Sequence, residues 1–411
     1  MLDPLFSGPW AVPRLRSGPF GPWLDSFTDR LAGLGYSHWG CRSEVVLAAD
    51  LGRWMERKKI PARMLDESVV DSYVEHRKTQ RERRRAASLN FLHHLRAEGT
   101  VPPPPCVADL SPVGLHCRRY EEHLRKERGA CEGTVEGYVV VVRDFLGRCF
   151  ATEPVELATL DAADIGEYLL DRARTRSPRR VGYLAGVLRS FFRFLFARGE
   201  TSSDLSTAVL TPRTTRFAIV PRYLPAADVE RLLQACDLNT GAGRREHAIL
   251  LLLARLGLRA GEVAFLDLDD IRWRSGEIVV RGKGNVVDRL PLLPDVGKAI
   301  ALYLVKDRPK TSFRRLFLRL CPPIRGLGGR GAVSTVVRRA LKRAGLRPPI
   351  RGAHLLRHSL GTRMIRAGAS MAEIAEVLRH HSPGTTEIYA KVDFETLRAL
   401  AQDWPDAGGG R

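Results

Sequence analysis

The alternation of apolar and polar residues divides the chain into helical stretches and one short β unit. The segment Glu246–Arg255 is almost entirely apolar, which predicts a helix that is buried on all sides. Gly257 should end this helix. Two segments with strand character, 271–280 and 286–292, flank a glycine-rich turn that contains Lys283, and they predict a β-hairpin. A capped helix is expected from Ala227-Asp228 through Leu233, and further helices at 260–266, 333–345, 359–368 and 371–378.

Proline-rich breaks separate the regions of this pattern. Residues 1–23 include five prolines and predict an irregular leader. An extra helical module is expected at 24–105, because the run Pro102–Pro105 cannot continue a helix. A second helical module is expected at 110–205, a linker at 206–222 and a mixed domain at 223–411. The expected fold class is therefore mainly α with a small β-sheet (α+β).

The two helical modules resemble each other at a nearly constant distance along the chain. The same offset of 95 positions relates three pairs of sites: Leu51-Gly52-Arg53 with Leu146-Gly147-Arg148, Tyr73 with Tyr168, and Arg77 with Arg172. Near the module ends, Phe91–Gly99 parallels Phe191–Gly199 with an offset of 100. These offsets favour a duplicated module, and chance identity between amphipathic helices is the alternative.

Charge and cysteine content narrow the class of protein. The 411 residues include 66 Lys and Arg against 46 Asp and Glu, giving a net charge of +20. Such an excess favours a polyanionic partner, although an arginine-rich composition inherited from base usage would look similar. Seven cysteines without a CxxC pair indicate neither a disulfide framework nor a zinc site. No signal peptide or long apolar run is present, so we expect a cytoplasmic protein with no membrane span.

Basic residues and one tyrosine follow a fixed order in the last third of the chain. They are Gly257-Leu258-Arg259-Ala260-Gly261-Glu262, His354-Leu355-Leu356-Arg357-His358, Leu378-Arg379-His380 and Tyr389. A planar guanidinium can hold two oxygens of one phosphate. Histidine can donate to a phosphate or accept a proton, and a tyrosine hydroxyl can form a covalent intermediate. The set predicts nucleophilic cleavage of a phosphodiester.

These motifs resemble the two arginine boxes of the tyrosine recombinase (phage integrase) family. The resemblance covers roughly residues 220–400, and residues 110–200 resemble the family's helical, SAM-like core-binding domain more loosely. It implies a site-specific DNA recombinase that cleaves and rejoins strands through a 3′-phosphotyrosine, without a cofactor, metal or ATP. The implied roles are a phosphate clamp (Arg259, Arg357), supporting histidines (His354, His380), a general acid (Lys283), an orienting carboxylate (Glu262) and the nucleophile (Tyr389).

The second box offers more than one histidine and departs from the family pattern at one residue. Counting back nine residues from Tyr389 selects His380 by the family's spacing, and His358 is expected to pack behind the site. The family usually has glycine where this chain has Arg379. Since glycine there permits a tight turn after a helix, Arg379 should either adopt a strained backbone or extend the helix by one residue. Its side chain could add a phosphate contact.

The resemblance also implies partners. Double-stranded DNA is expected as the substrate, held by a homo-tetramer, or by a hetero-tetramer with a related recombinase, on two DNA sites. A short amphipathic helix expected at 394–402 would dock on a neighbouring protomer or on its own domain. A type IB topoisomerase, a catalytically decayed DNA-binding protein and a helix-turn-helix regulator are the alternatives. Integration, transposition and dimer resolution stay open, and the extra N-terminal module favours a mobile-element enzyme.

Overall fold

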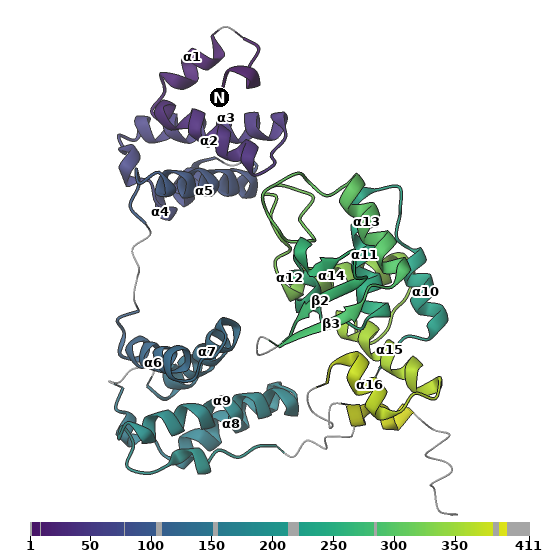
Figure 1. Ribbon diagram of the computed structural model, residues 1–411. Coiled ribbons are helices and arrows are strands. Elements are labelled where there is room, and N and C mark those ends of the chain that lie inside the picture. Colours follow the sequence, from purple (N-terminus) through teal and green to yellow (C-terminus); the bar gives the residue numbers. More distant parts are fainter. Residues whose placement is uncertain are drawn as a thin grey trace, which may run out of the picture. The chain divides into compact units, whose positions relative to one another are not determined.

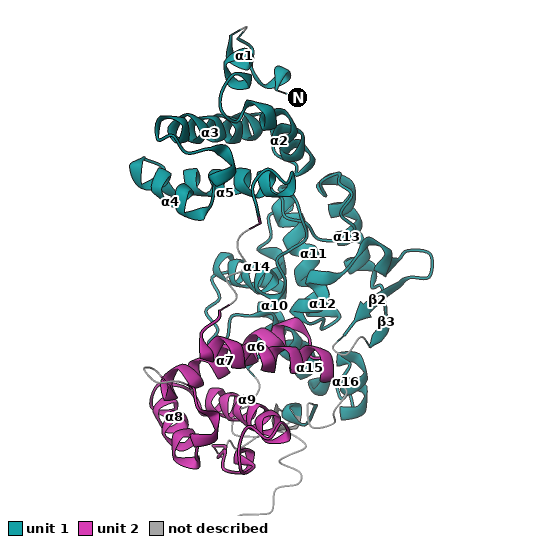
Figure 2. Cartoon of the chain, turned by 90° about the vertical axis from the view of Figure 1, so that its left-hand side faces the viewer, with its two compact units in different colours: residues 1–102, 219–411 teal, residues 103–218 magenta. Residues whose placement is uncertain are grey.

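The computed structural model describes residues 2–8, 10–77, 79–103, 109–150, 155–212, 222–282, 286–380 and 386–392. Contacts between residues divide the chain into two compact units, 1–102 together with 219–411, and 103–218 (Figure 2). Helices dominate both units, and a small antiparallel sheet lies in the first (Figure 1). The predicted fold class, mainly α with a small β-sheet, is confirmed.

The N-terminal part is helical from near its start. Its helices are α1 (Ala11–Arg16), α2 (Gly21–Gly33), α3 (His38–Arg57), α4 (Glu67–His76) and α5 (Arg81–Ala97). The prediction of an irregular leader over 1–23 was wrong for α1 and for the start of α2. Leu15 and Phe20 are buried in the core of this part, and a proline in the first turn of α2 costs no helical hydrogen bond.

The unit 103–218 holds the second helical region. Its helices are α6 (Pro112–Glu122), α7 (Glu132–Cys149), α8 (Ala162–Thr175) and α9 (Pro178–Ala197), with a π-helical turn at His123–Glu127. The apolar stripe of α9 lies in the core, where Phe191 and Phe192 are fully buried. Because α9 contacts both α7 and α8 through this stripe, it holds the unit together.

The C-terminal part combines helices with a three-stranded sheet in the order β1-β2-β3. Its elements are α10 (Ala226–Gln234), α11 (Gly241–Arg255), α12 (Ala260–Phe265), β1 (Ile271–Arg272), β2 (Glu277–Arg281), β3 (Val287–Pro291), α13 (Pro294–Lys306), α14 (Arg330–Arg343), α15 (Ala353–Arg366), α16 (Met371–Leu378) and a 3-10 segment (Glu387–Val392). Helix α11 is buried along its apolar run, as predicted. The predicted hairpin is β2 paired with β3. Its turn residue Lys283 lies outside the described residues.

Within the described residues, no helix combines the length and the apolar character needed to cross a bilayer.

Candidate active site

Arg259 opens α12 from a turn that requires glycine. Gly257 has a φ of +58°, and a β-carbon there would lie 2.7 Å from Leu378 Cδ2. The turn places Arg259 at the N-cap of α12, where its backbone N–H donates to Glu262 Oε2 at 2.8 Å and its Nη1 donates to Oε1 at 2.7 Å. The Arg259 side chain stays 32% exposed, so an incoming anion can reach it. The contact expected between Glu262 and Arg259 is present.

Arg357 lies on α15 and joins three segments. Its guanidinium donates to the carbonyl oxygens of Gly257 and Leu378, and the residue is 4% exposed. Burial, and then the charges of Arg259 and Arg379, lower the pKa of Arg357 to about 10. The group is still protonated at neutral pH, so a second fixed positive charge lies beside Arg259.

Arg379 adopts the strained of the two predicted conformations. Helix α16 ends at Leu378, and Arg379 has a φ of 54° and a ψ of 55°. A non-glycine residue there costs roughly 1–2 kcal/mol. Its guanidinium is not turned to solvent: Nη2 lies 2.8 Å from Glu262 Oε2 and Nε lies 3.6 Å from Asp288 Oδ2 on β3. The pair with Glu262 is buried and the pair with Asp288 is partly exposed, and both favour the observed conformation of Arg379.

Glu262 therefore forms ion pairs with two arginines, Arg259 and Arg379. Burial acts to raise the pKa of its carboxyl, but the hydrogen bond from the Arg259 backbone N–H and the charge of Arg379 hold that pKa below its ordinary value. The carboxylate is ionised, yet it faces three guanidinium groups in Arg259, Arg357 and Arg379. The cluster therefore carries more positive than negative charge, a balance that attracts anions.

Tyr389 lies beside the arginines and contacts a histidine. Its Oη is 3.0 Å from His358 Nδ1, and the residue is 1% exposed. Burial raises the pKa of Tyr389 to about 12, and the charge of Arg357 acts against this rise. The ring of His380 stacks on the Tyr389 ring at 6.4 Å between centroids and 5° between planes. His380 Nδ1 is in turn 2.8 Å from Thr386 Oγ1, which fixes the orientation of its ring.

His358 is the residue whose place sequence reasoning missed. It was expected to pack behind the site, whereas the structure puts its ring nitrogen at the tyrosine hydroxyl. Burial, and then the charges of His354 and Arg357, lower the pKa of His358 to about 4, so its imidazole is neutral at pH 7. A signal was available: His358 and Gly361 are one turn apart on α15, which leaves room for a ring on that helix face.

The structure thus brings together most of the predicted site residues. Arg259, Glu262, Arg357, His380 and Tyr389 meet where the ends of α12, α15 and α16 converge. His354, in the first turn of α15, has its ring 6.3 Å from that of His358. Lys283 lies outside the described residues. Among those that are described, no three His, Cys, Asp or Glu side chains cluster so that they could hold a metal ion.

Comparison with known proteins agrees with this geometry. Residues 222–396 match the phage integrase family, and residues 117–199 match the phage integrase N-terminal SAM-like domain. An integrase/recombinase of Sinorhizobium fredii, y4rA, is 39% identical over 400 residues, spanning 96% of this chain and 97% of its own length. The chain belongs to the phage integrase family. It is a tyrosine recombinase, an enzyme that cleaves and rejoins DNA.

More distant relatives of the recombinase cover a smaller share of the chain. Tyrosine recombinase XerD of Listeria monocytogenes is 32% identical, over 65% of this chain and 90% of its own length. A crystal structure of a lambda integrase dimer bound to a COC′ core site has a TM-score of 0.52 at 19% identity, covering 71% of this chain and 98% of the other. At that identity the likeness shows a shared fold.

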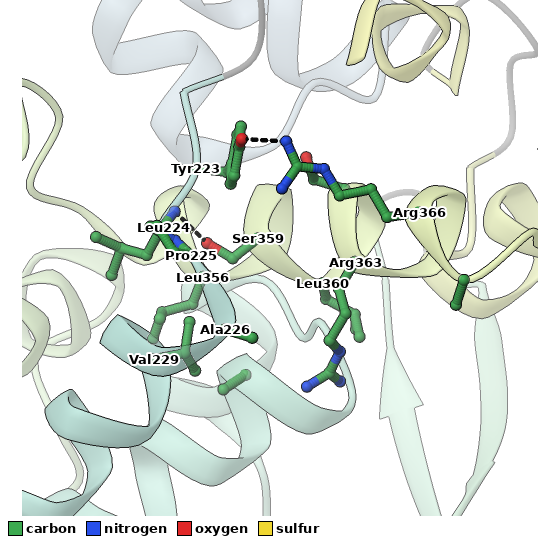
Figure 3. Close-up of a pocket in the computed structure, with 13 residues that line it drawn as sticks. Tyr223, Leu224, Pro225, Ala226, Val229, Leu356, Ser359, Leu360, Arg363 and Arg366 are labelled. Carbon is green, nitrogen blue, oxygen red and sulfur yellow. Dashed lines mark hydrogen bonds between the residues drawn. The ribbon is translucent and has the colours of Figure 1, made fainter. Parts of the chain in front are cut away.

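The recombinase also has a pocket on α15, lined by other residues than those at Tyr389. This pocket, of about 320 Å³, lies between α15 and the segment that leads into α10 (Figure 3). Leu356 and Leu360 supply apolar lining, while Arg363 and Arg366 add positive charge. Arg366 Nη2 donates to Tyr223 Oη at 2.5 Å. The pocket suits an apolar segment that carries negative charge.

Proposed function

We propose that the recombinase cleaves one DNA strand by attack of Tyr389 Oη on the scissile phosphodiester. The Oη–P bond forms as the P–O5′ bond breaks, leaving a 3′-phosphotyrosine and a free 5′ hydroxyl. The tyrosine proton passes to a histidine, and the leaving oxygen receives a proton from Lys283. Because the phosphotyrosine conserves the bond energy, a 5′ hydroxyl of a second strand can reverse the step without ATP or a metal.

The single observation that carries this proposal is the excess of guanidinium groups beside a tyrosine. The transition state gathers negative charge on the non-bridging oxygens, and Arg259 and Arg357 would stabilise it as a preorganised pair. By analogy with other preorganised donors, loss of either should slow cleavage about 10²-fold or more.

The histidines divide the remaining work in this proposal. His358 offers its neutral Nδ1 to Tyr389 Oη, so it is the acceptor best placed for the tyrosine proton. His354 and His380 would donate hydrogen bonds to the phosphate oxygens. This assignment makes His358 the acceptor of the tyrosine proton, whereas the family's motifs select His354 and His380 as the supporting histidines.

A suicide substrate tests the proposal directly. The substrate carries a nick next to the cleavage site, so that cleavage releases a short fragment and traps the protein on DNA. Wild-type protein should form a covalent adduct, and Tyr389→Phe should bind the same DNA without forming one. An adduct with Tyr389→Phe would show that another residue is the nucleophile.

A type IB topoisomerase would share this chemistry, but it would not need two target DNA sites. Supercoiled plasmids with two target sites and with none separate the activities, because relaxation alone needs no pairing of sites. The similarity to integrase/recombinase y4rA and to tyrosine recombinase XerD favours recombination. A decayed DNA-binding protein is disfavoured because Arg259, Arg357, His380 and Tyr389 are all present.

The active form in this proposal is a tetramer on two DNA sites, built from this chain alone or with a related recombinase. The pocket on α15 would receive the tail of a neighbouring protomer. Phe394, Leu397 and Leu400 repeat at helical spacing in that tail, and Glu395 matches the charge of Arg363. Leu397→Glu should keep suicide-substrate cleavage but abolish paired-site complexes in a native gel. Paired complexes with this variant would exclude the pocket-and-tail contact.

The biological setting we propose is a mobile element, with the enzyme acting in the cytoplasm. The similarity to an integrase/recombinase over nearly the whole chain supports this setting. Mapping adducts across DNA cloned from around the gene would locate the target, and a site at the end of a repeated element would support transposition or integration.

A further inference from the structure

The N-terminal helices repeat the helix order of the SAM-like domain. In each, a long helix leads to a 3-10 turn, a helix capped by aspartate and a final long helix: α3, Ala62–Met64, α4 and α5 in one, and α7, Leu157–Thr159, α8 and α9 in the other. The two 3-10 turns begin 95 positions apart, and so do α4 and α8. The order of elements thus follows the offset seen in the sequence.

Both regions also contain a polar triad of the same residue types, in which the aspartates are 94 positions apart and the tyrosines and arginines 95. Asp50 accepts hydrogen bonds from Tyr73 Oη and Arg77 Nη2, each at 2.7 Å. Asp144 accepts from Tyr168 Oη and Arg172 Nη2, again each at 2.7 Å. Chance similarity of amphipathic helices explains shared apolar spacing, but it does not place three matching polar residues of two helices in mutual contact.

The helix ends match as well. Asp66 and Asp161 cap α4 and α8 through their side chains. After α5 and α9, Gly99 and Gly199 have φ values of 72° and 69°. In both turns the N–H of the following residue donates to a leucine carbonyl oxygen at 3.0 Å. Thr100 donates to Leu95 in one turn, and Glu200 donates to Leu195 in the other. Caps, triad and closing turn together indicate two copies of one module.

We propose that residues 24–102 are a second SAM-like module, and that it contacts duplex DNA through the arginine corner where α4 meets α5. The corner is defined by Arg77, Arg81, Arg83, Arg84 and Arg85. Six of the nine residues 77–85 are Arg or Lys, against one Glu. The proposal rests on the enzyme's action on DNA and adds a contact outside the two regions that match the family.

The corner keeps an excess of positive charge, although Arg85 pairs with Asp71 at 2.7 Å. Asp50 is one carboxylate, yet it pairs with Arg77 at 2.7 Å, Arg84 at 3.0 Å and Arg53 at 3.9 Å. Arg83 donates to the neutral hydroxyl of Ser43, and Arg81 is exposed in the first turn of α5. The N-terminus of α5 adds the positive end of its helix dipole. Phosphates of a duplex are the polyanion that such a surface binds.

The corresponding corner of the family-matched module has the same chemistry. Arg174, Arg176, Arg179 and Arg180 are exposed where α8 meets α9. Since this charged corner is the surface feature that the two copies share, we assign it the shared task of binding the DNA backbone. The enzyme then has one more DNA contact than the SAM-like and catalytic regions supply.

Salt-dependent binding by full-length protein tests the proposal. Arg81→Ala/Arg83→Ala removes two corner charges and spares the Asp50 triad. Arg57→Ala/Arg63→Ala, which removes two exposed charges of the same module outside the corner, is the matched control. Each lost phosphate contact lowers the slope of log Kd against log salt by about 0.9, so the corner variant should lose roughly 1–2 from the slope. Its hydroxyl-radical footprint should be shorter than that of the wild type.

The outcomes separate this proposal from the catalytic one. An unchanged slope and footprint, or an equal loss in both variants, would overturn the DNA-binding role of the corner. The control variant, Arg57→Ala/Arg63→Ala, should form the covalent adduct at the wild-type rate. If wild-type protein forms no adduct, the proposed chemistry fails, while the binding comparison still decides on the arginine corner.

Discussion

The position of the Tyr389 ring on α15 can be perturbed by one methyl group. Gly361 lies under this ring: a β-carbon added there would be 2.5 Å from Tyr389 Cζ, 2.7 Å from Cε1 and 3.0 Å from Cε2. Carbon atoms pack at about 3.5–4.0 Å, so in Gly361→Ala the ring has to move by about 1 Å. A misplacement of that size at a reacting group costs roughly 10²-fold in rate.

Folding should tolerate this substitution. Gly361 has ordinary helical backbone within α15, where alanine is favoured over glycine by about 1 kcal/mol. Part of that gain offsets the strain of the displaced ring. We therefore expect a defect in chemistry with little change in the urea midpoint of unfolding or in DNA affinity.

The assay is the rate of adduct formation on the suicide substrate at saturating protein. Gly331→Ala on α14 is the matched control, because a β-carbon there would meet nothing within 4 Å. The control should react at the wild-type rate and Gly361→Ala about 10²-fold more slowly. A wild-type or faster rate for Gly361→Ala would refute the reasoning, since the ring position on Gly361 would then not be the one from which the hydroxyl reacts.

Three further predictions concern residues around the tyrosine. His358→Phe removes the acceptor at Tyr389 Oη and should slow adduct formation by about 10² or more; an unchanged rate would exclude His358 as the base. Arg379→Gly restores the family's residue and relieves the left-handed backbone. It should still lower the rate of adduct formation, because Glu262 then pairs with Arg259 alone. A higher rate than that of the wild type would contradict this prediction. The folded-state pKa values of His358 and His380 are about 4, below the ordinary 6.5, so the unfolded chain takes up protons first. Stability measured by urea unfolding should therefore fall as pH drops from 6.5 to 4, less steeply in His358→Phe.

Much of the site could be predicted because its residues sit in short, ordered motifs. Gly257 and Arg259 are separated by a single residue, and the need for a left-handed turn before a helix is visible in the sequence. Helix α16 was predicted at 371–378 and begins and ends there, because Ser370 caps it and its apolar residues repeat at helical spacing. The prediction for residues 1–23 was wrong for the opposite reason. The prolines suggested irregular structure, whereas the burial of Leu15 and Phe20 depends on packing against other helices.

Long-range contacts account for what the sequence did not reveal. The spacing from Tyr389 favoured His380. Which histidine contacts the hydroxyl, however, depends on how the 386–392 segment packs on α15, and His358 is 31 residues away from Tyr389 in sequence. Arg379 shows how such contacts can be inferred from a conflict. A side chain at a position that suits glycine makes the local backbone unfavourable, which implies stabilising contacts elsewhere in the structure. Here Glu262, 117 positions away, and Asp288 on β3 provide it. The residue that departs from the family pattern is therefore the one that ties the arginine clamp to the hairpin strand.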